Sequence, residues 1–282
     1  MRKNPPLEHV LRHDRILVLA ALSAVVLLAV LYTVFGVGMN MSALEMTTGS
    51  MGEATAMGGK TMQQGGMAAM AMPAAWTPGY AVLVFFMWWI MMIAMMVPSA
   101  APTVLLYSAL TRKSAQANGA PRLTFVFLSG YLVVWAGFSL LATAAQWLLE
   151  LNGYVSPMMM VLVSNTLAGI VLLVAGLYQF TPLKDACLNH CRSPLAFLIG
   201  SHRPGAGGAF RMGLEHGAFC LGCCWFLMAL LFVGGIMNLY WIAGLAIYVA
   251  VEKLAPSGRT VGRVAGVAMA AGGLWLLGQS YL

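Results

Sequence analysis

Met212–Val233 reads MGLEHGAFCLGCCWFLMALLFV. The run is apolar apart from Glu215 and His216 near its start, and it is long enough to cross a bilayer, which takes about 20 mainly apolar residues in a helix. It also holds three of the five cysteines of the chain. We expect a transmembrane helix that keeps thiols where water is scarce.

The whole chain has the composition of an integral membrane protein, because 61% of its 282 residues are hydrophobic and only 8% are charged. Apolar runs of spanning length occupy 16–38, 80–110, 123–149, 158–180, 212–234, 238–254 and 263–281. The first run follows Arg12 and Arg15 as a signal peptide would. It is longer than a signal peptide's apolar region and lacks a clear cleavage site, so we expect a retained helix. The fold class predicted is all-α, a polytopic membrane helix bundle of about seven transmembrane helices.

Basic residues alternate between successive loops, and this alternation predicts the orientation. They lie before the first run, after the second, after the fourth and after the sixth, whereas the other connections hold Lys60 alone. Because cytoplasmic loops collect Lys and Arg, we expect the N-terminus inside and the C-terminus outside. The net charge of +7 then reflects topology and not nucleic-acid binding. The expected surroundings are the lipid bilayer of a bacterial inner (plasma) membrane.

Three parts of the chain differ in composition. Residues 1–38 form an N-terminal tail and the first transmembrane helix, 39–79 a Met-rich loop, and 80–282 a six-helix membrane core. The loop carries nine methionines among Gly, Ala, Ser, Thr and Gln, so we expect it to be flexible and extracytoplasmic. Thioether sulfur suits Cu(I) and needs no deprotonation. The loop is therefore either a tethered set of soft ligands or a plain linker.

Helical spacing places the soft side chains of the 212–234 run on one face. Residues three and four apart are neighbours on a helix surface. The stripe so defined consists of Met212, His216, Cys220, Cys223, Cys224 and Met228. Every member can bind a metal ion, although cysteine also packs as a small apolar residue in membrane helices.

The run 80–110 contains a second soft row. Met87, Met91 and Met95 are spaced i, i+4, i+8, with Met92 and Met96 beside them. Such rows either bind soft ions or serve as adaptable packing. Pro98 follows and should kink the helix, because it lacks an N–H and clashes with the preceding turn.

Two further cysteines, Cys187 and Cys191, lie in the loop after the fourth run and are four residues apart. On a helical turn both sulfurs would point the same way. Near the end of the sixth run we expect Glu252 and Lys253 to pair with each other at the interface. In the last run, Gly262 and Gly266 predict a close helix contact, within the chain or between chains.

The candidate metal ligands are Cys220, Cys223, Cys224, His216, Cys187, Cys191, Met91, Met95 and Met96. The thioethers favour copper as Cu(I); zinc or another soft metal could use the same cysteines and histidine. Haem with two histidine ligands from one chain is excluded, because His216 is the one histidine inside a run. We identify no catalytic residues and favour a role that is not enzymatic.

Several of these motifs resemble a family of predicted metal-binding integral membrane proteins, often labelled copper chaperones. The resemblance spans roughly residues 80–260. It is carried by Met91–Pro102, Tyr178–Arg192 with its two cysteines, Cys220–Met228, Met237–Leu239 and Glu252–Lys253. It implies a membrane protein with a role in copper handling.

The leading hypothesis is a membrane protein that binds Cu(I) for transport or for delivery to copper-enzyme assembly. Its expected partners are a cytoplasmic or periplasmic copper carrier or an assembly protein. Two other classes stay open: a thiol redox membrane protein, and a non-catalytic subunit or assembly factor of a membrane complex. The oligomeric state is not predicted.

Overall fold

A computed structural model describes residues 23–24, 26–33, 76–114, 119–156 and 160–279. Over these residues the chain is all-α, as predicted. An isolated antiparallel β-bridge joins Val155 and Leu162. The helices are α4 (Pro78–Arg112), α5 (Ala120–Leu151), α6 (Asn165–Tyr178), α7 (Pro182–Arg192), α8 (Pro194–Gly200), α9 (Gly205–Ala229), α10 (Leu231–Gly234), α11 (Leu239–Leu254) and α12 (Gly258–Gln279).

Four helical segments in the described part are long and apolar enough to cross a membrane: α4, α5, α9 together with α10, and α12. The bent pair α6 and α7, with an angle of 65° between them, would make a fifth. The prediction of apolar membrane helices is therefore confirmed. The count of seven and the inside N-terminus stay predictions. Of the first predicted run, residues 23–24 and 26–33 are described and helical. Residues 39–75 of the predicted Met-rich loop (39–79) lie outside the described residues.

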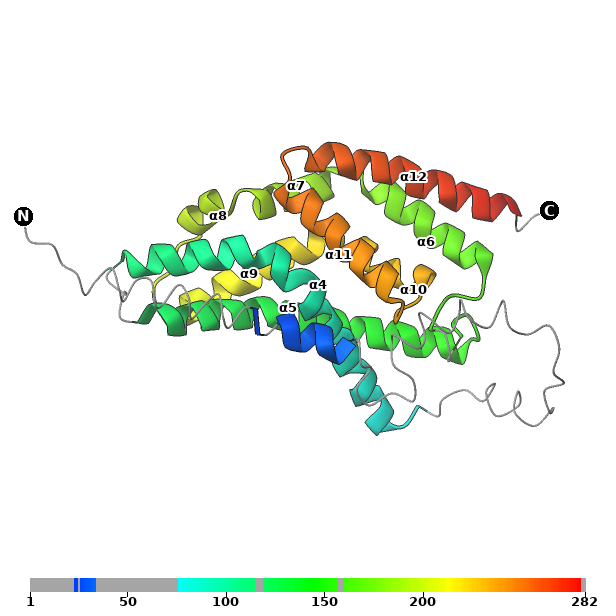
Figure 1. Ribbon diagram of the computed structural model, residues 1–282, viewed down its shortest axis with the longest axis horizontal. Coiled ribbons are helices and arrows are strands. Elements are labelled where there is room, and N and C mark those ends of the chain that lie inside the picture. The colour runs from blue at the N-terminus through cyan, green and yellow to red at the C-terminus, as the bar shows by residue number, and fades with distance from the viewer. Residues whose placement is uncertain (1–22, 25, 34–75, 115–118, 157–159, 280–282) are drawn as a thin grey trace, which may run out of the picture.

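The helices form two groups joined by α11 (Figure 1). Helix α5 packs against both α4 and α9, and α6 packs along α12 on the other side of the bundle. Helix α11 contacts both α4 and α12. Helix α7 connects the groups in another way, because it leaves the end of α6 and packs on α9.

Glycine lets α5 and α9 approach until their backbones touch. A Cβ atom at Gly213 would stand 2.0 Å from the carbonyl oxygen of Phe127, and one at Gly130 would stand 2.2 Å from that of Phe210. No larger residue fits at either position without moving a backbone, as in other close membrane-helix crossings. This contact sets the cysteine-bearing face of α9 against α5.

The small face predicted on the last run packs within the chain. A Cβ atom at Gly266 would stand 2.7 Å from the side chain of Gln179, and one at Gly262 would stand close to the Glu252 carboxylate. Further along, Gly273 meets the backbone of Leu173 in α6. These glycines therefore serve contacts of α12 with α6 and α11.

Pro98 and Pro102 both lie inside α4, which changes direction along its length (Figure 1). Next to Pro98, the carbonyl of Met96 accepts hydrogen bonds from the hydroxyls of Ser99, at 2.9 Å, and Tyr131, at 3.2 Å. The Tyr131 hydroxyl thus ties this turn of α4 to α5.

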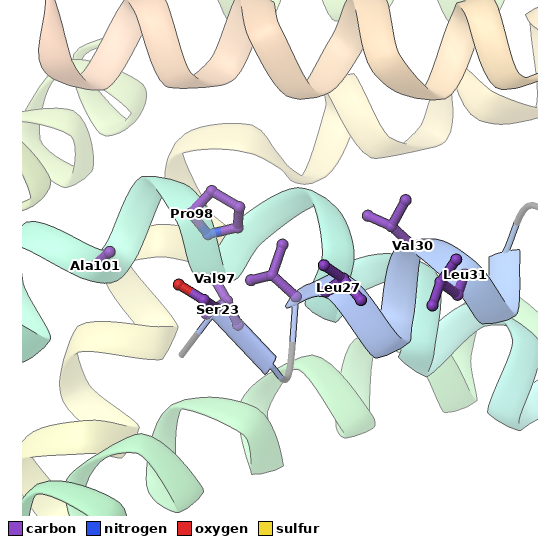
Figure 2. Close-up of a pocket in the computed structure, with 8 residues that line it drawn as sticks. Ser23, Leu27, Val30, Leu31, Val97, Pro98 and Ala101 are labelled. Carbon is purple, nitrogen blue, oxygen red and sulfur yellow. The ribbon is translucent and has the colours of Figure 1, made fainter. Parts of the chain in front are cut away.

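An apolar groove of about 580 Å³ lies against this part of α4. Figure 2 shows Leu27, Val30 and Leu31 of the 26–33 segment beside the stretch of α4 that holds Val97, Pro98 and Ala101. The lining residues that the structure describes include no Cys, His or Met. Their apolar side chains suit lipid acyl chains.

Candidate metal centre

The predicted stripe on α9 is a buried face of that helix. Its members are each no more than 3% exposed: Met212, His216, Cys220, Cys223, Cys224 and Met228. The face is directed inward because the glycines of α9 bring it onto α5, while α7 covers part of it. The common face expected from helical spacing is confirmed.

Cys220 is the point where four helices meet. Its sulfur lies 2.9 Å from the Lys253 ammonium of α11 and 3.1 Å from the Tyr131 hydroxyl of α5. The same ammonium donates to the Ser99 hydroxyl of α4 at 3.3 Å. All of these side chains are buried. The sulfur is therefore held in a polar pocket inside an apolar bundle.

The other two cysteines of α9 turn back toward their own helix. The thiols of Cys223 and Cys224 each donate to the carbonyl of Cys220 at 3.0 Å. Cys224 also lies 4.0 Å, sulfur to sulfur, from Met96 of α4. One methionine of the predicted α4 set thus meets the cysteines.

Met91 and Met95 are buried within α4, like Met87 and Met92. Among the described residues, no sulfur contact joins Met91 or Met95 to a cysteine. Their assignment as ligands stays a prediction, and their present surroundings are those of core packing.

Helix α7 brings the loop cysteines to α9. It begins at Pro182 after Thr181, whose hydroxyl caps the first turn by accepting from the Lys184 N–H. The Cys191 side chain is partly buried and interacts with the Cys220 and Cys223 thiols. Cys187 faces Gly222, where an added Cβ atom would stand 2.7 Å from its sulfur. Five thiols from two distant segments therefore gather around one side of α9.

His216 lies one turn before Cys220 and is 3% exposed. Its ring stacks on Tyr131, with 5.7 Å between centroids, and on Phe127, at 6.1 Å. Its Nδ1 atom is buried without a hydrogen-bond partner. Such a nitrogen is free to accept a proton or a metal ion if the ring moves.

The cluster is gathered but does not have the geometry of a closed metal site. The described residues include no group of three or more His, Cys, Asp or Glu side chains arranged to hold an ion. Two cysteine thiols bond to a carbonyl, and Cys220 faces an ammonium. Binding of a metal ion here therefore requires a side-chain rotation, and the predicted ligand set stays a prediction.

The expected pairing of Glu252 with Lys253 is wrong. Glu252 forms a buried ion pair with Lys184 of α7 at 2.6 Å, and Lys253 faces Cys220 instead. Adjacent residues on a helix point about 100° apart and do not face each other, so these two side chains reach different partners. Arg192 of α7 adds a hydrogen bond of 2.7 Å to the Glu252 carbonyl. These contacts fasten α7, with its two cysteines, to α11.

Sequence reasoning missed Lys253 as a site residue. It lies in the last turn of the mainly apolar helix α11, next to Glu252, and an ionisable residue within a membrane helix tends to mark a functional position. That signal was present in the sequence. Glu215, by contrast, is 29% exposed and pairs with Arg203 at 2.6 Å, which suits a position at the end of a span.

A second polar network lies at the far end of α5 and was also missed. The Glu150 carboxylate accepts from the Trp76 indole and from the Gln146 amide, both at 2.8 Å. Gln146 in turn accepts from the Trp88 indole at 2.8 Å. The network ties α4 to α5 near the start of the methionine row.

A protein family matches most of the chain. The model of the PpoB2 family, described as "Copper chaperone", matches residues 85–276, a range that includes all five cysteines and Lys253. No curated protein and no solved structure matches the chain. Since the match spans well over half of the sequence, the chain belongs to this copper chaperone family.

Proposed function

We propose that the protein binds Cu(I) within the membrane at the cysteines of α9 and α7, for transport or for delivery to copper-enzyme assembly. The observation that carries the proposal is that the partly buried Cys191 of α7 lies beside the buried Cys220 and Cys223 of α9. Thiolate and thioether sulfur are the ligands that Cu(I) prefers. Membership of a copper chaperone family supports the choice of metal.

The arrangement suggests a route made of ligand exchanges. Methionines of the 39–79 loop would collect the ion on the outside, and the α4 row would carry it toward Met96. Met96 lies beside Cys224, so a Cu(I) ion could pass from thioether to thiolate there. Cys191 and Cys187 would then exchange it with a carrier on the cytoplasmic side. The direction follows from the copper gradient and not from the ligands.

Bound metal in the purified protein tests the proposal. Wild type in detergent under reducing conditions, loaded with Cu(I) and then desalted, should retain copper, because the buried thiols provide a soft site. The variant Cys220→Ser/Cys223→Ser/Cys224→Ser should retain little. The variant Met269→Leu, which changes a soft residue of α12 away from the cluster, is the control and should behave as wild type. A wild-type protein that retains no soft metal would refute the function.

A thiol redox protein is the second candidate. Cys220 and Cys223 have C-x-x-C spacing, and the ammonium of Lys253 would stabilise a thiolate at Cys220. Free-thiol counts in redox buffers of graded potential separate the two functions. Reversible loss of two thiols near the cytoplasmic potential, together with no retained copper, would favour the redox function.

A further inference from the structure

This inference rests on the proposed function and concerns Lys253. The side chain is 5% exposed, and its ammonium contacts the sulfur of Cys220 and the hydroxyl of Ser99. The nearest carboxylate in sequence, that of Glu252, is paired with Lys184. Among the described residues, no carboxylate lies within ion-pair distance of Lys253.

A buried ammonium needs an anion, because removing one charge from water without a partner costs several kcal/mol. Inside a membrane, ionisable side chains likewise pair with one another or with polar backbone groups. The hydroxyl of Ser99 is neutral, so it can orient the ammonium but cannot balance its charge. The sulfur of Cys220 is the group in contact with Lys253 that can be negative, and it is also a proposed copper ligand.

The net charge of a Cu(I) ion bound to two cysteine thiolates explains what the contact between Lys253 and Cys220 could do. One Cu(I) ion on two thiolates has a net charge of −1, and a neutral thioether such as that of Met96 leaves this unchanged. A charge of −1 inside the bundle needs a positive partner for the same reason as a buried ammonium does. We propose that Lys253 is the fixed counter-cation of the copper site and makes a two-thiolate Cu(I) complex electrically neutral within the membrane.

The same count of charges predicts which metal ions the site prefers. A divalent ion such as Zn²⁺ on two thiolates is neutral by itself, so the ammonium beside it would be left without an anion. Lys253 therefore favours a monovalent soft ion over a divalent one at a two-thiolate site. Lys253 is a positioning residue, since it acts on the ion through the ligand sulfur.

Competition with a chromophoric Cu(I) chelator at one fixed pH tests this role. Lys253→Met should weaken Cu(I) binding by at least roughly tenfold, which is about 1.4 kcal/mol. Lys253→Gln removes the charge but can still bond to Ser99, so it should show the same loss and serves if the Met variant does not fold. Lys253→Arg keeps the charge and should stay much closer to wild type.

Tyr131→Phe is the matched control, because it removes neutral hydrogen bonds, to the same sulfur and to the Met96 carbonyl, and leaves the charge unchanged. Its Cu(I) affinity should fall far less than that of Lys253→Met. A second readout is the preference for Cu(I) over Zn²⁺, which should shrink when the charge is removed and persist in Lys253→Arg.

Two results would overturn the inference while the proposed function stands: an uncharged variant that binds Cu(I) as tightly as wild type, or a loss in Tyr131→Phe as large as that in Lys253→Met. A wild-type protein that binds no Cu(I) would instead refute the proposed function, and this inference with it. The wild-type measurement therefore separates the two failures.

Discussion

Glu252→Gln is expected to destabilise the protein by about 3–5 kcal/mol, the usual cost of breaking a buried ion pair from one side. Glu252 and Lys184 are each 2% exposed, and their charged atoms lie 2.6 Å apart. Without the carboxylate, the ammonium of Lys184 keeps the amide oxygen of Gln179 as a partner but has no anion. Denaturant titration in detergent, followed by tryptophan fluorescence, measures the free energy of unfolding.

The double variant Lys184→Met/Glu252→Gln removes both charges and should recover much of the lost stability, because no buried charge is then unpaired. Glu215→Gln is the control. Its ion pair with Arg203 is partly exposed, and such pairs contribute about 0–1 kcal/mol. Equal losses in Glu252→Gln and Glu215→Gln would show that the Lys184–Glu252 pair does not fasten α7 to α11.

Cys220→Ser is expected to lower Cu(I) affinity more than any other single cysteine replacement. Its sulfur meets Lys253 and Tyr131 and lies in range of Cys191, so it occupies the centre of the cluster. Loss of a residue that only orients a metal ligand already costs about 10–100-fold. Replacing this sulfur should therefore lower the Cu(I) affinity by more than about 100-fold. Chelator competition measures it.

Cys187→Ser provides the comparison. Cys187 packs on Gly222 at the edge of the cluster, so its replacement should reduce affinity much less. The expected order is thus a large loss at Cys220 and a small one at Cys187. A larger loss of affinity in Cys187→Ser than in Cys220→Ser would indicate that the copper site lies on α7 and not inside the bundle.

Much of the fold follows from apolar run length. The run 123–149 became α5, Ala120–Leu151, and the run 238–254 became α11, Leu239–Leu254. Helical spacing also placed His216 and Cys220 correctly on one buried face. These features are local, since they depend on residues a few positions apart, and a single sequence contains the information that fixes them.

The contacts between helices could not be predicted from the sequence, because they join residues that are far apart along the chain. Cys191 meets Cys220 because the chain bends by 65° between α6 and α7 and returns to α9. Likewise, the rotation of α11 about its axis decides that Lys253, and not Glu252, faces the cysteines. Spacing alone could not tell that Met96, of all the α4 methionines, would lie beside a thiol.

X-ray absorption at the copper K-edge, on wild-type protein loaded with one equivalent of Cu(I), tests the central claim most directly. The account predicts an edge typical of Cu(I) and a nearest shell of two thiolate sulfurs, absent in Cys220→Ser/Cys223→Ser/Cys224→Ser. A nearest shell of nitrogen or oxygen, or a spectrum unchanged by the three replacements, would contradict it.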